Sequence, residues 1–246
     1  MGLLKILFPN RTAPSEKIVA VPDLLMPGQT AELRVRRNPR ARRISLRVDT
    51  ADSSIALTVP WNTSVEEGLR FARNQGDWLR RRLAAVPVRI AFADGSQFEF
   101  LGSTVTVRRM ANGHTHLADG VLYVSGAPEF VARRVSDWLK AQARTAIGLR
   151  AHALAEQTGR EVKAIRIRDT RTRWGSAAAD GTLAFSWRLV LAPLDVLDYV
   201  VAHEVAHLTH MNHSAAFWAL VARLCPTHTA PRAWLAANGA KLLRHG

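Results

Sequence analysis

The sequence predicts an α+β protein: a β-rich first half with one long helix, followed by an α+β domain with more helix. Hydrophobic residues repeat with period two over residues 31–60 and 96–126, which is typical of strands. Turn dipeptides such as Asn112-Gly113 and Asp119-Gly120 separate these short segments. From residue 127 onward, longer segments with helical spacing and recognisable start and stop residues dominate.

Length and composition restrict the class of protein. The chain has 246 residues, of which 48% are hydrophobic and 22% charged, so we expect one or two folded domains. A lone cysteine, Cys225, excludes an internal disulfide framework and a zinc finger built from cysteines. No segment approaches 18 consecutive apolar residues, and the first residues lack the features of a signal peptide. We therefore expect no membrane partner and a cytoplasmic location.

The formal net charge of +14 comes almost entirely from arginine. One interpretation is a surface that binds phosphates or other anions, and the other is a compositional bias unrelated to partners. The densest group of arginines lies among alternating apolar residues, so it fits the solvated face of two strands: Arg34, Arg36, Arg37, Arg40, Arg42, Arg43 and Arg47. A nucleic acid or another anionic partner is therefore a secondary hypothesis.

The first half contains two predicted regions. Residues 1–30 hold four prolines and show little periodicity, which predicts an irregular N-terminal segment. Residues 31–126 form the β-rich region, which includes a helix from Ser64 to about Ala85. Ser64 followed by Glu67 is the pattern of a capping box at the start of that helix.

Residues 127–246 are expected to form the second domain. Its first helix begins near Pro128 and ends at Gly159, because proline favours a first helical turn and glycine a helix end. Two strands then flank a loop with the sequence TRTRWGS, and three helices follow. The expected strands are 163–168 and 181–189, and the expected helices are 194–210, 215–224 and 231–243.

Residues 203–207 read His-Glu-Val-Ala-His and lie inside the expected helix 194–210. Positions four apart share one helix face about 6 Å apart along the axis, so His203 and His207 can bind one zinc ion. Glu204 lies beside that face, where it can act as the general base toward a zinc-bound water. The alternative interpretation is a pair of hydrogen-bonded histidines on a core helix.

A catalytic zinc site needs a third protein ligand and an open position. No acidic residue occurs between Val205 and Gly246, so the downstream candidates are His210, His213, His228 and His245. His210 continues the same helix face, and one straight helix does not easily place three rings around one ion. Met211-Asn212 can leave the helix before Ser214 starts the next, so His213 can approach from another direction. His213 is the preferred third ligand, with His228 and His210 as weaker alternatives.

Arg173 lies in the loop just upstream of this helix. It could bind a substrate carboxylate or phosphate, or stabilise the oxyanion that forms during hydrolysis. The structural alternative is an ion pair with Asp169 or Asp198, or a helix C-terminal cap.

Several segments together form a more specific pattern than the five-residue motif alone. They are Arg-Trp-Gly-Ser at 173–176, Ser-Trp-Arg-Leu at 186–189, the ten residues 198–207, Met-Asn-His-Ser at 211–214, and Phe217-Trp218. This pattern resembles the YgjP-like metallopeptidases, a family related to the SprT-like and M48-type metallopeptidases. The resemblance is dense over about 165–235 and looser through the N-terminal part.

The resemblance implies a zincin-like catalytic domain over 127–246 and zinc bound by His203, His207 and His213. It also implies that Glu204 is the catalytic acid and base. One departure is visible: Ala177 stands where the family commonly has cysteine, so any role of that thiol is in doubt for this chain.

The leading hypothesis is therefore a zinc metallopeptidase that cleaves peptide bonds in peptide or protein substrates. The first alternative is a metal-dependent nucleoside triphosphate pyrophosphohydrolase, because guanidinium groups suit phosphates. The second is a nucleic-acid-associated binding protein with a structural zinc, which would normally have a fourth protein ligand and no open position.

Overall fold

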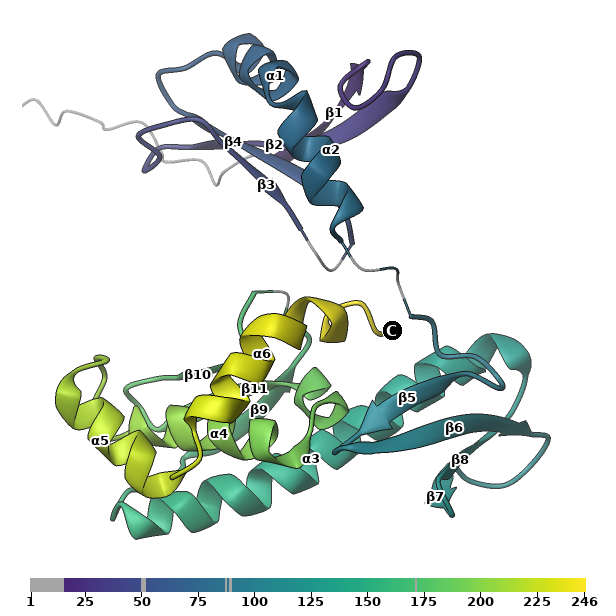
Figure 1. Ribbon diagram of the computed structural model, residues 1–246, viewed down its shortest axis with the longest axis vertical. Coiled ribbons are helices and arrows are strands. Elements are labelled where there is room, and N and C mark those ends of the chain that lie inside the picture. The colour runs from purple at the N-terminus through teal and green to yellow at the C-terminus, as the bar shows by residue number, and fades with distance from the viewer. Residues whose placement is uncertain (1–15, 50–51, 87, 89, 171) are drawn as a thin grey trace, which may run out of the picture. The chain divides into compact units, whose positions relative to one another are not determined.

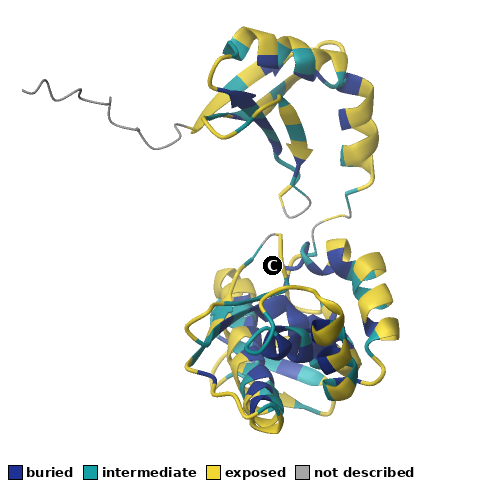
Figure 2. Cartoon of the chain, turned by 90° about the vertical axis from the view of Figure 1, so that its left-hand side faces the viewer, coloured by how far each residue is buried: buried dark blue, intermediate teal, exposed yellow. Residues whose placement is uncertain are grey.

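The computed structural model describes residues 16–49, 52–86, 88, 90–170 and 172–246. It has the α+β class that the sequence predicts, with most strands in the first half (Figure 1). The chain divides into two compact units, Met1–Val86 and Pro87–Gly246, and each unit has its own hydrophobic core. Figure 2 shows the buried residues gathered in the interior of each unit.

The first unit is a four-stranded sheet with two helices packed on one face. Its strand order is β1-β2-β4-β3, in which β2 and β4 are parallel and the other neighbours antiparallel. Alternate strand residues such as Leu33, Val35 and Leu57 point toward the helices and form the core, because successive strand side chains face opposite sides. The elements are β1 (Glu16–Pro22), β2 (Thr30–Asn38), β3 (Ser45–Val48), β4 (Ile55–Pro60), α1 (Val65–Asn74) and α2 (Gly76–Ala84).

The irregular segment predicted over 1–30 differs from the structure. Residues 1–15 lie outside the described part, but residues 16–22 form β1. Val21 enters the core, and the loop after Pro22 returns the chain antiparallel into β2. The Asp23 carboxylate accepts a hydrogen bond from the Gly28 N–H at 2.6 Å and stabilises that loop. The apolar residues of β1 are consecutive, from Ile18 to Val21, so the segment lacks the alternation of apolar and polar residues by which a strand is predicted.

The single helix predicted over 64–85 is two helices that meet at Gln75. The predicted capping box is present: the Glu67 N–H donates to the Ser64 hydroxyl, and the Ser64 N–H donates to the Glu67 carboxylate. Gly76 is the first residue of the second helix, and a Cβ atom there would lie 2.9 Å from the Leu24 carbonyl oxygen. Only glycine fits there without moving that loop.

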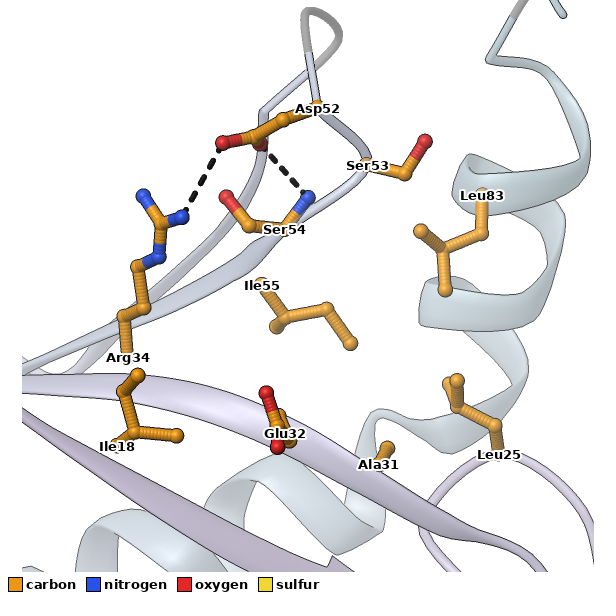
Figure 3. Close-up of a pocket in the computed structure, with 10 residues that line it drawn as sticks. All are labelled: Ile18, Leu25, Ala31, Glu32, Arg34, Asp52, Ser53, Ser54, Ile55 and Leu83. Carbon is orange, nitrogen blue, oxygen red and sulfur yellow. Dashed lines mark hydrogen bonds and ion pairs between the residues drawn. The ribbon is translucent and has the colours of Figure 1, made fainter.

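A pocket of about 410 Å³ lies in this unit, beside β1, β2 and α2 (Figure 3). Leu25, Ile55 and Leu83 line its apolar part, and an ion pair between Arg34 and Asp52 at 3.2 Å lies on its rim. Arg37 donates to two backbone carbonyl groups. Two of the clustered arginines thus have partners inside the unit, and the remaining five are exposed.

The second unit contains two sheets and a set of helices around one helix. The sheets have the orders β5-β6-β8-β7 and β10-β11-β9. The helix α4 contacts α3, α5, α6 and β10, so it lies at the centre of the unit (Figure 1). The elements are β5 (Gln97–Phe100), β6 (Ser103–Met110), β7 (His116–Ala118), β8 (Val121–Ser125), the short helix η1 (Pro128–Phe130), α3 (Val131–Gln157), β9 (Ala164–Arg168), β10 (Gly175–Ala177), β11 (Thr182–Ser186), the short helix η2 (Trp187–Leu191), α4 (Leu194–Ala206), α5 (Ala215–Leu224) and α6 (Thr229–Leu242).

The division at Val86–Pro87 differs from the boundary that the sequence predicts after residue 126. The sheet β5–β8 shares its core with α3: Val107 and Leu122 of the sheet belong to the same buried cluster as Val135 and Leu139 of the helix. The residues of this shared core are far apart in the sequence. The point where the sequence pattern changes from strands to helices therefore does not coincide with the boundary between the two units.

Two local differences lie near the functional region. The strand predicted over 181–189 ends at Ser186, because the Ser186 hydroxyl accepts from the Arg188 N–H and starts the turn η2. The expected TRTRWGS loop contains a strand, β10, that pairs antiparallel with β11. Among the described residues, no helix combines the length and apolar composition needed to cross a membrane.

Candidate metal centre

Two of the predicted ligands lie one turn apart on α4. His203 belongs to the helix and His207 is its C-terminal cap, and their ring centres are 5.0 Å apart. The helix is almost entirely buried, with Ala202, Val205 and Ala206 fully enclosed. Because other elements pack around this helix, the two imidazoles keep a fixed distance and orientation on one helix face.

The third predicted ligand reaches the same point from outside the helix. After α4 the chain turns, and Ser214 caps α5 by accepting a hydrogen bond from the Phe217 N–H. The turn places His213 Nε2 3.1 Å from His203 Nε2. Candidate ligand nitrogens of His203, His207 and His213 all lie within 4.8 Å of one another. The structure therefore brings together the three histidines that the sequence singles out.

The geometry and chemistry of this group fit a zinc ion. Ligands at about 2.0–2.1 Å from a tetrahedral zinc are about 3.3 Å apart, close to the separation of the His203 and His213 nitrogens. Zinc binds neutral imidazole. Burial first, and then the charges of His207, His213 and Arg232, lower the pKa of His203 to about 4, so this ring is neutral at pH 7.

A backbone group orients the second candidate ligand, His207. His207 Nδ1 lies 2.9 Å from the carbonyl oxygen of His210. A carbonyl only accepts, so Nδ1 is the protonated nitrogen and Nε2 remains for a metal. His210 thus contributes its backbone. His228 contacts the carbonyl of Cys225 through its own Nδ1 and does not belong to the three-histidine group.

Aromatic side chains form one wall of the centre. The buried Phe217 ring lies 4.5–4.9 Å from the three imidazole rings, measured between ring centres. Trp218 lies 5.8 Å from His203 and 6.0 Å from His213. Phe217 is buried and Trp218 is half-buried, so the two rings pack against the imidazoles and Trp218 keeps part of its surface open to solvent.

Glu204 is buried beside the histidines and packs against strand β10. It is 6% exposed, and a Cβ atom at Gly175 would lie 2.5 Å from its Oε1 atom. Burial raises the pKa of Glu204 to about 7, and the positive charge of Arg173 opposes that rise. The sequence did not predict this contact, although Gly175 stands in the Arg-Trp-Gly-Ser segment that it singled out.

Arg173 is exposed and is near enough to Glu204 to act on its pKa. The two acidic residues that the sequence offers as partners of Arg173 form ion pairs with other arginines: Asp169 pairs with Arg188, and Asp198 pairs with Arg150. Among the described residues, Arg173 has no ion pair. The next residue, Trp174, packs against Gly239 of α6, where a Cβ atom would lie 3.1 Å from the indole.

The three-histidine group has no fourth histidine, cysteine or carboxylate donor within the described part of the chain. Three imidazoles leave one position of a tetrahedral ion for solvent or substrate, which is the arrangement of catalytic zinc sites. His213 is exposed, so the group is open to solvent on its side. A buried carboxyl group next to such a position can exchange protons with a molecule bound there.

The contact between Gly175 and Glu204 predicts a coupled effect on stability. Gly175→Ala should lower the free energy of unfolding by about 1–3 kcal/mol, because the new methyl group overlaps the carboxyl group. In a Glu204→Ala background the same substitution should cost much less. Gly148→Ala is the control, since a Cβ atom there meets nothing within 4 Å. Additive denaturation energies in the double mutant would show that the two residues are not in contact.

Because Glu204 is buried, we expect its ionisation to lower the free energy of unfolding of the metal-free protein, by an amount that depends on pH. Its folded-state pKa of about 7 exceeds the ordinary value of 4.5, so the cost develops as pH rises from 4.5 to 7 and is constant above. Glu204→Gln should therefore stabilise the metal-free protein by about 3 kcal/mol near pH 8 and have little effect near pH 4.5. Urea denaturation in the presence of a chelator measures this. A variant that is less stable than the parent at both pH values would contradict the buried position.

Comparison with known proteins identifies the family. The YgjP-like metallopeptidase domain matches residues 42–238, which is most of the chain. No curated protein and no solved structure matches this chain. The match includes the α4 motif, the turn to His213 and the strand β10 against which Glu204 packs. The chain therefore belongs to the YgjP-like metallopeptidase family.

Proposed function

We propose that this chain is a zinc-dependent peptidase whose ligands are His203, His207 and His213 and whose general base is Glu204. The observation that supports the proposal most strongly is the convergence of three imidazoles beside one buried carboxyl group. Membership of a metallopeptidase family makes a peptide or protein the expected substrate. A cytoplasmic location remains a prediction from the sequence.

When bound, zinc would lower the pKa of a water molecule to about 7 and polarise the carbonyl group of the scissile bond. Side chains of the protein carry out the proton transfers. Glu204 accepts the proton of the attacking water on its carboxylate and passes it to the leaving amine nitrogen. Burial raises the pKa of Glu204 to about 7 in the metal-free protein, and the positive charge of a bound zinc ion would lower that pKa and favour the ionised form that accepts the proton.

Arg173 is the second functional residue of the proposal. Its exposed guanidinium group acts on Glu204 and has no ion pair among the described residues. A positive charge in this position favours the ionised form of Glu204 and attracts the oxyanion or a carboxylate of the substrate. No comparable observation favours a nucleotide substrate, which therefore serves as the alternative in the test.

Glu204→Gln should reduce hydrolysis of an unstructured protein such as casein by about 10²–10⁴-fold, because it removes the general base. The variant should still bind one zinc ion per chain, since the three imidazoles are unchanged. The control is Glu161→Gln, which alters an exposed carboxyl group outside the centre. Zinc content is measured on the same preparations.

Nucleoside triphosphates are assayed in parallel with the protein substrate. Peptide hydrolysis that is unchanged in Glu204→Gln would refute the role of Glu204. Hydrolysis of a nucleoside triphosphate by the zinc-loaded protein, with no cleavage of peptides, would refute the peptidase and support the alternative.

A further inference from the structure

An arginine that the sequence analysis did not single out lies next to the metal centre. Arg232 is in the first turn of α6, and its guanidinium carbon lies 4.7 Å from the ring centre of Trp218. The same indole lies 5.8 Å from the His203 ring and 6.0 Å from the His213 ring. One indole ring therefore separates the guanidinium group from two of the three imidazoles.

The indole also fixes the position of this charge. A guanidinium group over an aromatic face is attracted to the ring, and its planar shape allows it to keep its hydrogen-bond donors free at the edges. Arg232 is exposed, and it has no ion pair among the residues that the structure describes. Its donors are thus available to a ligand.

The charges around the centre are unbalanced. Glu204 beside the histidines is buried, whereas Arg232 on α6 is exposed. No acidic residue occurs between Val205 and Gly246, the segment that contains α5, α6 and the turn to His213. Asp169 and Asp198 form ion pairs elsewhere. Arg173 adds a second exposed positive charge on the β9–β10 loop.

We propose that Arg232 forms a subsite for a carboxylate of the substrate, so that this enzyme selects acidic peptides. The proposal rests on the peptidase function inferred above and names its substrate class. An extended peptide advances about 3.3 Å per residue. A guanidinium group one indole away from the imidazoles would therefore meet a glutamate or aspartate side chain, or a free C-terminal carboxylate, within about three residues of the scissile bond.

The test measures binding, so that it does not depend on turnover. Zinc-loaded Glu204→Gln protein is titrated into fluorescent peptides that differ only in one residue, Glu, Gln or Lys, placed at each of three positions on either side of the central bond. A parallel set compares free and amidated C-termini. At one position or terminus, the carboxylate peptide should bind about two- to five-fold more tightly than its neutral counterpart, the range of an exposed ion pair.

Substitutions at Arg232 should change this preference in a defined order. Arg232→Gln abolishes it, Arg232→Lys keeps part of it, and Arg232→Glu reverses it in favour of the lysine peptide. Arg223→Gln is the matched control, because it removes an exposed arginine of α5 and should leave the preference intact. The preference should also shrink as the salt concentration rises.

Equal binding of the carboxylate and neutral peptides at every position would overturn the proposal. A preference that survives Arg232→Gln and Arg232→Glu would overturn it as well. Failure of the peptidase function is a separate result: a carboxylate preference that depends on Arg232, together with no cleavage by the wild-type protein, supports the subsite and refutes the peptidase. Cleavage without the preference refutes the subsite alone.

Discussion

The candidate metal centre of this protein depends on the convergence of three imidazoles from two separate segments. Two come from one turn of α4, a helix enclosed by α3, α5, α6 and β10. The third arrives through the turn before Ser214, and the carbonyl of His210 in that turn orients His207. A turn of this kind serves two purposes: it brings His213 to the other two candidate ligands and selects the tautomer of His207. Small changes in the length of this turn would remove both effects.

The same packing that aligns the ligands places a carboxyl group where its charge is unfavourable. Glu204 is buried against the backbone of β10 at Gly175, and burial raises its pKa to about 7. A folded protein keeps such a group only where other interactions offset its cost, and this combination is common at catalytic sites. The positive charge of Arg173 opposes this rise in pKa, and Arg232 supplies a second exposed positive charge near the centre. The buried proton acceptor Glu204 therefore lies near two exposed arginines.

Sequence patterns revealed the features that depend on near neighbours. The spacing of His203 and His207, the capping box at Ser64 and the start of α5 at Ser214 all follow from helix geometry, and the structure contains each of them. The contacts between distant segments were not visible. The strand β10 forms because it pairs with β11. The division after Val86 follows from a core shared by β6, β8 and α3. The contact between Gly175 and Glu204 joins two elements that are far apart in the sequence. Arg232 was missed for the same reason, since only the folded chain places it over Trp218.

The three-histidine site is best tested by X-ray absorption at the zinc edge, because scattering from the whole ring counts the imidazole ligands and a sulfur ligand is recognised by its longer bond. For the zinc-loaded protein we expect three imidazole nitrogens at about 2.0–2.1 Å and one further light-atom ligand from solvent, and one imidazole fewer in His213→Ala. A shell with a sulfur atom, with four protein nitrogens, or with no change in His213→Ala would contradict it.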